Sequence, residues 1–426
     1  MSDLPSRKAI VTVNSLPLPS QMEATSASDT QSDVDPLERA LLMNRYRALR
    51  RRLEAEAALA GNDVLITAQD PEVSRLQSRL AELAVEGQEL GPGGQEVKFG
   101  SGVEGRDWFG WLKSMLDWVD RKEAHPFIWS TAAADAVPDA LSMAIMGDWG
   151  TALYGAPKIA ENIKAKGPFD VLMHLGDVYY SGTADEIKSR FIAPWPFTAG
   201  KISRTLNANH EMYSGGYGYF DIALPRFGQK ASYFALQNAN WLIVGLDTAY
   251  VDHDMDPRQV DWLAATIAAA GSRKVVLFSH QQLFSRLDDQ GVKLEAKLRG
   301  LLETKRITAW YWGHEHQCVL YDKHPTWNLT ARCLGNGGIP EPRKKEVLQA
   351  PVEITQGPVT WKRLKPLAEK PWAPSCLALD GANPDVKGRE NDFVPHSYMT
   401  LHFEGPVLKE RVQLPDGTLI FENEIS

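Results

Sequence analysis

The sequence predicts an α/β fold, with helices flanking sheets, over the part of the chain that begins near residue 138. Short apolar runs of strand length recur there, for example LSMAIM at 141–146 and KVVLFS at 274–279, with helix-like stretches such as 155–166 and 257–270 between them. The other runs lie at 170–175, 202–207, 232–236, 241–246 and 307–312. Alternation of strands with helices is typical of sheets covered by helices, and this observation carries the fold prediction.

The composition bounds the class of protein and its partners. Of the 426 residues, 43% are hydrophobic and 23% are charged, as in an average soluble globular protein. The net charge of −8 at pH 7 argues against a nucleic-acid or anionic-membrane binder, because such proteins usually present a basic surface. We therefore expect neither a nucleic acid nor a membrane as a partner.

Cysteine usage and the N-terminus indicate the compartment. Cys318, Cys333 and Cys376 are widely spaced and odd in number, which suits a reducing compartment. The chain has no apolar run of about 18 residues, the length that spans a membrane. Its first residues form a poor signal-peptide core, because Asn14 and several prolines interrupt the apolar part. The expected location is cytoplasmic, with secretion as the alternative.

The first third of the chain differs in texture from the rest. Residues 1–35 are rich in Ser, Thr, Asp and Pro without a sustained period, which predicts a disordered leader. Residues 36–130 carry apolar residues at helical spacing, such as Leu37, Leu41 and Leu49, and are expected to form a helical N-terminal extension. These helices would either pack on the main domain as a cap or form a homo-oligomer or partner-binding module.

Residues 138–426 are expected to form one domain with an insertion. The stretch 340–395 holds many Pro, Lys and Trp residues and little period, which predicts a long irregular insertion of the kind that often acts as a lid. The tail at 397–422 returns to strand-like alternation, with an Asp-Gly turn at 416–417.

Polar side chains follow five of the apolar runs at the point where each strand should end. Asp148 follows 141–146, and the others are Asp177, Asn209 with His210, His280, and His314 with His316. One such residue is more often a structural one that caps a helix or packs in the core. Five strand ends are rarely marked in this way by independent structural needs, and in open α/β sheets ligands gather at the carboxyl ends of the strands.

The residue types at these strand ends point to a metal centre. Carboxylates and imidazoles together suit first-row metals such as zinc, iron and manganese better than magnesium or calcium. The donors are too many for one tetrahedral zinc. They are enough for two metals that share a bridging carboxylate, an arrangement that stabilises both the attacking and the leaving oxygen in phosphoryl transfer.

The motifs together resemble those of the calcineurin-like metallophosphoesterase superfamily, and within it the purple acid phosphatase branch. They are GDWG (147–150), GDVYY (176–180), NHE (209–211), SH (279–280) and GHEH (313–316), and the resemblance covers roughly residues 140–340. It implies a four-layer α/β/β/α sandwich of two mixed sheets, which agrees with the alternation of strands and helices.

The resemblance also implies a ligand set for each of two metals. By this likeness the first metal is bound by Asp148, Asp177, Tyr180 and His316, and the second by Asp177, Asn209, His280 and His314. The wider superfamily has Asp-x-His in its first motif, whereas Gly150 stands at that position here and Tyr180 follows the bridging Asp177 by three residues. In the purple branch this tyrosine replaces the histidine. A phenolate favours Fe(III), so the expected pair is Fe(III) plus Fe(II), Zn(II) or Mn(II).

The expected activity follows from the same resemblance. The chain would be a phosphatase that hydrolyses phosphate monoesters by in-line attack of a metal-bound hydroxide, with His210 as general acid or transition-state stabiliser. A phosphodiesterase acting on cyclic nucleotides or phospholipid head groups is an alternative, and a non-catalytic binding protein on the same fold is a further one.

Gln281 and Gln282 follow His280 where many purple acid phosphatases carry substrate-side histidines, which puts an acid pH optimum in doubt. The glycines at 335–338 are expected to let the backbone approach the site.

Overall fold

The computed structural model describes the chain from residue 124 to its end and three residues before that point. The described residues are 124–426 without Tyr180, Ser181, Tyr213 and Asp252, together with Ala40, Asn44 and Arg47. The predicted leader at 1–35 and most of the predicted helical extension at 36–130 lie outside the described residues and stay predictions. The three described residues of the extension before 124 are helical, and residues 124–134 form neither helix nor strand.

The larger of two sheets has ten strands in the order β1-β5-β6-β7-β8-β10-β9-β13-β12-β11. Its strands are β1 (Asp135–Ala136), β5 (Phe234–Gln237), β6 (Trp241–Gly245), β7 (Lys274–Ser279), β8 (Ile307–Trp312), β9 (Cys318–Tyr321), β10 (Thr330–Leu334), β11 (Val352–Gln356), β12 (Val359–Leu364) and β13 (Cys376–Gly381). The pairs β6·β7, β7·β8 and β8·β10 are parallel, and those from β10 to β11 are antiparallel. The sheet is therefore mixed.

The second sheet has six strands in the order β16-β15-β14-β2-β3-β4. Its strands are β2 (Ala140–Met146), β3 (Val171–His174), β4 (Ile202–Thr205), β14 (Tyr398–Glu404), β15 (Val407–Gln413) and β16 (Leu419–Ile425). The strands β2, β3 and β4 are parallel, and β14 to β16 join β2 as an antiparallel meander. The strand-like tail predicted at 397–422 is thus confirmed.

The central strands of both sheets, such as β2 and β7, are buried on both faces, which explains their nearly continuous apolar runs. In β2, Met143 and Ile145 lie in a core between the two sheets, whereas Ala144 and Met146 face a core beneath helices. Alternate residues of β7 likewise divide between the inter-sheet core and a core beneath other helices. Both faces of these central strands therefore favour apolar side chains.

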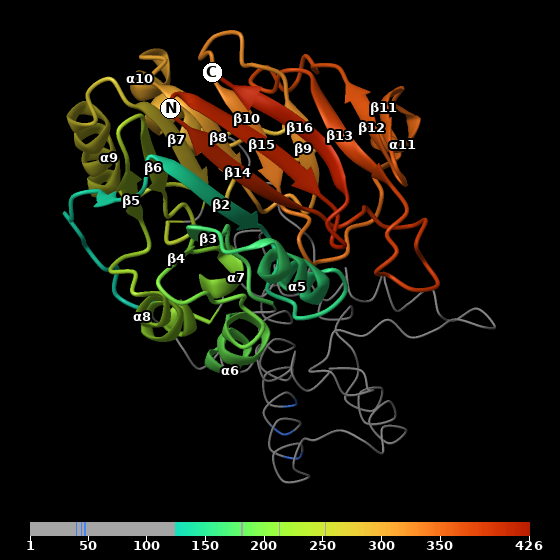
Figure 1. Cartoon of the computed structure of the whole chain (residues 1–426), viewed down its shortest axis with the longest axis horizontal. Coiled ribbons are helices and arrows are strands. Elements are labelled where there is room, and N and C mark those ends of the chain that lie inside the picture. The colour runs from blue at the N-terminus through green and yellow to red at the C-terminus, as the bar shows by residue number, and fades with distance from the viewer. Residues whose placement is uncertain are drawn as a thin grey trace, which may run out of the picture. The chain divides into compact units, whose positions relative to one another are not determined.

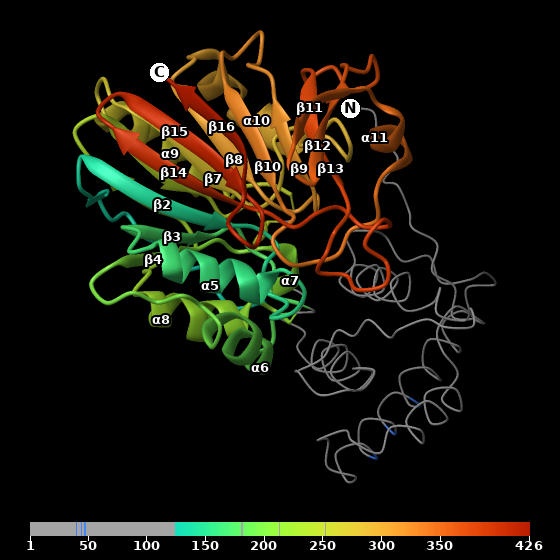
Figure 2. The ribbon, with the colours of Figure 1, turned by 45° about the vertical axis from the view of Figure 1, so that its right-hand side comes forward.

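Helices cover the outer face of each sheet (Figure 1 and Figure 2). On the six-stranded sheet lie α5 (Ala156–Lys166), the π-helices η3 (Ile187–Ile192) and η4 (Tyr219–Ala223), and α8 (Leu224–Phe227). On the ten-stranded sheet lie α9 (Pro257–Ala269) and α10 (Val292–Glu303). The predicted four-layer α/β/β/α sandwich of two mixed sheets is confirmed. None of the helices among the described residues has the length and apolarity needed to cross a membrane.

The expectation of an irregular insertion at 340–395 is wrong. This stretch contains the short helix α11 (Lys345–Gln349) and strands β11, β12 and β13, which extend the ten-stranded sheet at one edge. In β12 the buried Val359 and Trp361 alternate with the half-exposed Thr360 and Lys362, a period-two pattern that the neighbouring proline and lysine residues obscure. The Trp361 indole donates to the carbonyl of Ile420 at 2.9 Å, which ties this edge to the other sheet.

Candidate metal centre

The predicted site residues lie at the carboxyl ends of parallel strands from both sheets. Asp148, Asp177 and Asn209 follow β2, β3 and β4 of the six-stranded sheet. His280 follows β7, and His314 with His316 follow β8, of the ten-stranded sheet. All these residues converge on one place, and Tyr180 alone among the predicted metal ligands lies outside the described residues.

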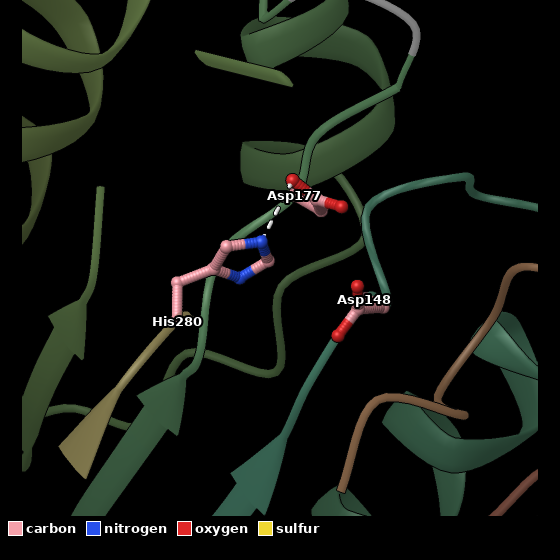
Figure 3. A group of neighbouring side chains, drawn as sticks. All are labelled: Asp148, Asp177 and His280. Atoms are coloured by element: carbon pink, nitrogen blue, oxygen red, sulfur yellow. Dashed lines mark ion pairs between the residues drawn. The ribbon is translucent and has the colours of Figure 1, made fainter. Parts of the chain in front are cut away.

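Three of these side chains form the centre of the site. Ligand atoms of Asp148, Asp177 and His280 all lie within 4.8 Å of one another, and all three residues are buried. Figure 3 shows the three side chains pointing toward a common space from three different strands. A buried group of two carboxylates and an imidazole can hold a metal ion.

Four donor atoms gather around Oδ1 of Asp177, and we call them the second donor set, after the second of the two predicted metals. They belong to Asp177, Asn209, His280 and His314. His280 Nε2 is 2.9 Å from Asn209 Oδ1, 3.2 Å from His314 Nδ1 and 3.3 Å from Asp177 Oδ1. His314 Nδ1 is also 3.1 Å from Asn209 Oδ1. Donors at about 2.1 Å from a tetrahedral metal lie about 3.4 Å apart, so these distances suit one ion.

The first donor set (Asp148, Asp177, Tyr179 and His316) lies on the other side of Asp177 and includes a residue that the sequence prediction missed. The Tyr179 hydroxyl is 3.0 Å from Asp177 Oδ2, 3.1 Å from His316 Nε2 and 3.4 Å from Asp148 Oδ1. His316 Nε2 is 3.4 Å from Asp148 Oδ1. The aromatic ring of Tyr179 is fully buried, and its carbonyl accepts a hydrogen bond from the buried Arg190 at 2.9 Å.

Asp177 belongs to both sets through different oxygens. Its Oδ1 lies near His280 Nε2, whereas its Oδ2 lies near the Tyr179 hydroxyl, with His316 Nε2 at 3.9 Å. The two sets therefore share one carboxylate, which is the geometry that a bridging ligand requires.

The protonation pattern of the second donor set fits a cation. His280 Nδ1 lies 2.8 Å from the carbonyl of Leu175, which can only accept, so this nitrogen carries the proton. Burial lowers the pKa of His280 to about 4, which keeps the ring neutral and leaves a lone pair on Nε2. That lone pair points at the Asn209 oxygen and at His314 Nδ1. Lone pairs that converge at such distances favour a metal ion between them.

The first donor set carries more negative charge. Burial raises the pKa of Asp148 to about 8, so this carboxylate needs a nearby cation to stay ionised at neutral pH. Burial likewise raises the pKa of the Tyr179 phenol well above its usual range, and the charges of Asp177 and Asp148 raise it further. For Asp177 burial acts in the same direction, but the imidazoles of His210 and His280 outweigh it and hold its pKa well below the usual range. The donors therefore fit metal ions on both sides of Asp177.

Each of the three imidazoles has a polar partner at its outer ring nitrogen. His280 donates to Leu175, as described, and His316 Nδ1 lies 3.5 Å from the Glu341 carboxylate. His314 Nε2 lies 3.2 Å from His253 Nε2. Metal-binding histidines usually donate their second ring nitrogen to such a partner, which fixes the tautomer. Glu341 and His253 were not predicted from sequence, because neither follows a strand end directly.

The backbone at the site is strained. Asp148, Asp177, His314 and His316 all have φ between 52° and 74°. This left-handed region is unfavourable for residues with a Cβ, and such strain gathers at functional sites where the surrounding structure enforces it.

The backbone leaves no room for a side chain at Gly150. A Cβ at this position would lie 2.6 Å from the carbonyl oxygen of Asp177, because Gly150 and Val178 form a close backbone bridge. No side chain at 150 could reach the site without moving that bridge. The glycines at 335–338 do approach the site as predicted, since a Cβ on Gly335 would lie 3.0 Å from Asp148 Oδ2.

His210 lies beside the first donor set. Its Nε2 is 3.8 Å from Asp177 Oδ2, and its ring lies with its centroid 4.5 Å from that of Tyr179. Gln281 and Gln282 are buried and bond to other parts of the chain: Gln281 accepts from the Thr248 hydroxyl, and Gln282 donates to the Asp289 carbonyl at 3.0 Å.

One comparison with known proteins matches the part of the chain that carries these residues. Residues 141–318 match the family model described as calcineurin-like phosphoesterase. No curated protein matches the chain by sequence.

Several solved structures resemble the fold. A purple acid phosphatase from yellow lupin (Lupinus luteus) seeds superposes with a TM-score of 0.50 and 15% identity over 70% of this chain and 55% of its own. PhoD gives a TM-score of 0.43 and 12% identity over 69% and 70% of the two chains. A putative 5′-nucleotidase from Staphylococcus aureus gives 0.32 and 12% over 57% and 53%. This chain thus spans little more than half the length of the lupin protein, and at such identities the likeness concerns the fold.

Proposed function

Because residues 141–318 match the family model of calcineurin-like phosphoesterases, we propose that the chain is a dinuclear metal-dependent phosphatase that hydrolyses phosphate monoesters. One observation carries the proposal: two sets of donor atoms share Asp177, with one carboxylate oxygen facing each set. The first donor set would hold one ion and the second donor set the other. When bound, two such ions supply Lewis-acid chemistry, since they acidify a water and neutralise charge on phosphoryl oxygens.

The protein's own groups have separate tasks in this proposal. Asp177 fixes the spacing of the two donor sets. The hydrogen bond to Leu175 holds the ring of His280 in place, and the ion pair with Glu341 holds that of His316. His210, which belongs to neither donor set, would donate a proton to the departing oxygen or stabilise charge on the phosphoryl group. Its place beside Asp177 supports this role.

The substrate class can be tested with two model compounds. The purified protein, loaded with iron and then zinc or manganese, is expected to hydrolyse p-nitrophenyl phosphate with kcat/KM at least about tenfold above that for bis(p-nitrophenyl) phosphate, a difference of about 1.4 kcal/mol in barrier. The opposite preference would indicate a phosphodiesterase. Absence of activity with every metal combination, together with absence of bound metal, would leave only a binding role.

Tyr179 is proposed as the phenolate ligand of the first donor set, in place of the predicted Tyr180. The support is the position of its hydroxyl among Asp148, Asp177 and His316, whereas Tyr180 lies outside the described residues. A phenolate is a hard anionic donor that suits Fe(III) and gives a visible charge-transfer band.

The neighbouring tyrosines provide a matched pair of variants. Tyr179→Phe is expected to abolish the visible band of the iron-loaded protein and to lower the bound iron by about one ion per chain, because the anionic donor is lost. Tyr180→Phe is expected to keep both. The measurements are an absorption spectrum and metal analysis. The reverse result would assign the ligand to Tyr180, and an unchanged spectrum in both variants would remove the iron assignment.

A further inference from the structure

His253 lies on a long loop that the known motifs do not include. The loop joins β6 to α9, and His253 is a half-buried residue on it. Its Nε2 lies 3.2 Å from His314 Nε2, with the two rings at an interplanar angle of 77° and centroids 5.0 Å apart. An edge-on contact of this kind suits an N–H to lone-pair hydrogen bond between the rings.

The first residues of the loop are anchored to two segments that carry members of the second donor set. At its start, the Asp247 carboxylate accepts from the side-chain amide of Asn207, two residues before Asn209, at 3.2 Å. Beside it, the Thr248 hydroxyl accepts from the backbone N–H of Gln281, next to His280, at 3.2 Å. These bonds couple the position of the loop to that of the second donor set.

The other end of the loop is fixed to α10. Lys297 Nζ pairs with the Asp254 carboxylate at 2.7 Å and donates to the carbonyl of Met255 at 2.6 Å. Between these anchors, His253 itself has φ 53°, the same left-handed conformation as Asp148, Asp177, His314 and His316. The surrounding bonds thus hold His253 in an unfavourable backbone conformation that brings its ring to His314.

The direction of this hydrogen bond follows from the second donor set. His314 Nδ1 lies against Asn209 Oδ1 and His280 Nε2, so binding an ion there requires its lone pair. The proton of the neutral His314 ring must then sit on Nε2, which faces His253. His253 Nε2 is the acceptor that this arrangement needs.

We infer that His253 is a positioning residue that accepts the Nε2 proton of His314 and so presents His314 Nδ1 to the metal of the second donor set. The inference rests on the proposed function. It adds to the centre a histidine from the β6–α9 loop that acts through His314 rather than on the metal or the substrate.

Two substitutions separate hydrogen bonding from packing. His253→Leu removes the acceptor and keeps an apolar side chain, and it is expected to weaken binding of the second Zn(II) or Mn(II) by about 10- to 100-fold, the usual loss for an outer partner of a metal-binding histidine. His253→Gln restores an acceptor oxygen and is expected to bind within about threefold of the unchanged protein. The measurement is competition of the iron-loaded protein with a chromophoric chelator for zinc.

The control and the alternatives make the outcome decisive. His402→Leu changes a histidine on β14 whose register partner on β2 is Ser142. Ser142 lies at the opposite end of β2 from Asp148, so this variant should leave zinc affinity unchanged. Unchanged affinity in His253→Leu would overturn the inference while leaving the proposed function intact. Equal weakening in the Gln variant would overturn the acceptor role. A wild-type protein that binds no second metal would instead refute the proposed function.

A measurement on the unchanged chain covers the case in which the Leu variant does not fold. In zinc-loaded protein labelled with ¹⁵N-histidine, long-range proton–nitrogen correlation is expected to show the His314 ring proton on Nε2 and the His253 ring proton on Nδ1. A His314 ring that carries its proton on Nδ1, or a His253 ring that carries it on Nε2, would overturn the inference.

Discussion

Replacing Asp177 with Asn is expected to remove most of the bound metal and nearly all of the activity. Asn keeps the size of the side chain but has one oxygen instead of two and no charge, so it cannot serve both donor sets. Loss of metal charge stabilisation costs several kcal/mol, which corresponds to a fall in kcat/KM of about 10³-fold or more. Metal analysis should find two ions per chain in the unchanged protein and at most one in the variant.

Asp170→Asn provides the matched control. Asp170 lies just before β3, at the opposite end of the strand from Asp177, and its carboxylate bonds to Ser142 and Lys201. The Asp170→Asn protein should keep both ions and full activity, because these contacts are remote from the donor sets. If Asp177→Asn retained two metals and unchanged kcat/KM, the shared-carboxylate centre would be wrong.

The strand-end pattern was sufficient to predict most of the centre. Asp148, Asp177, Asn209, His280, His314 and His316 were expected to meet, and they do, because parallel strands of each sheet end at the same edge and the two sheets pack face to face. The polar residue that follows a buried strand is placed by the strand itself, so its position depends little on the rest of the fold.

The parts of the centre that were missed depend on loop conformation. Tyr179 and Tyr180 are chemically identical neighbours, so the sequence alone does not show that the Tyr179 hydroxyl lies between Asp177 and His316. His253 and Glu341 reach the site from loops that are held by contacts distant in sequence. No periodic pattern marks such residues, so the sequence alone could not identify them.

The fold was predicted best where burial on two faces makes the strands uniformly apolar. The insertion at 340–395 was misjudged because β11 is an edge strand with mostly exposed residues and β12 is only partly buried. Edge strands tolerate lysine and nearby proline, which also mark loops. A strand whose outer side faces solvent therefore gives a weak signal in the sequence.

Replacing His210 with Ala is expected to lower kcat by about 10²- to 10⁴-fold while both metals stay bound, because a group that transfers a proton in the transition state contributes in that range. The side chain lies 3.8 Å from Asp177 Oδ2 and belongs to neither donor set, so its removal should leave the ligands in place. Metal analysis and the visible spectrum should match those of the unchanged protein. Asp177→Asn, in contrast, is expected to lose bound metal together with activity.

The leaving group distinguishes the two roles considered for His210. If it donates a proton to the departing oxygen, the loss in kcat should be much larger for phenyl phosphate than for p-nitrophenyl phosphate, because p-nitrophenolate leaves without protonation. If it stabilises charge on the phosphoryl oxygens, the loss should be similar for both substrates. His402→Ala, on β14, should change neither rate. A His210→Ala protein with full kcat on both substrates would exclude the residue from catalysis, and the proton would then have to come from solvent.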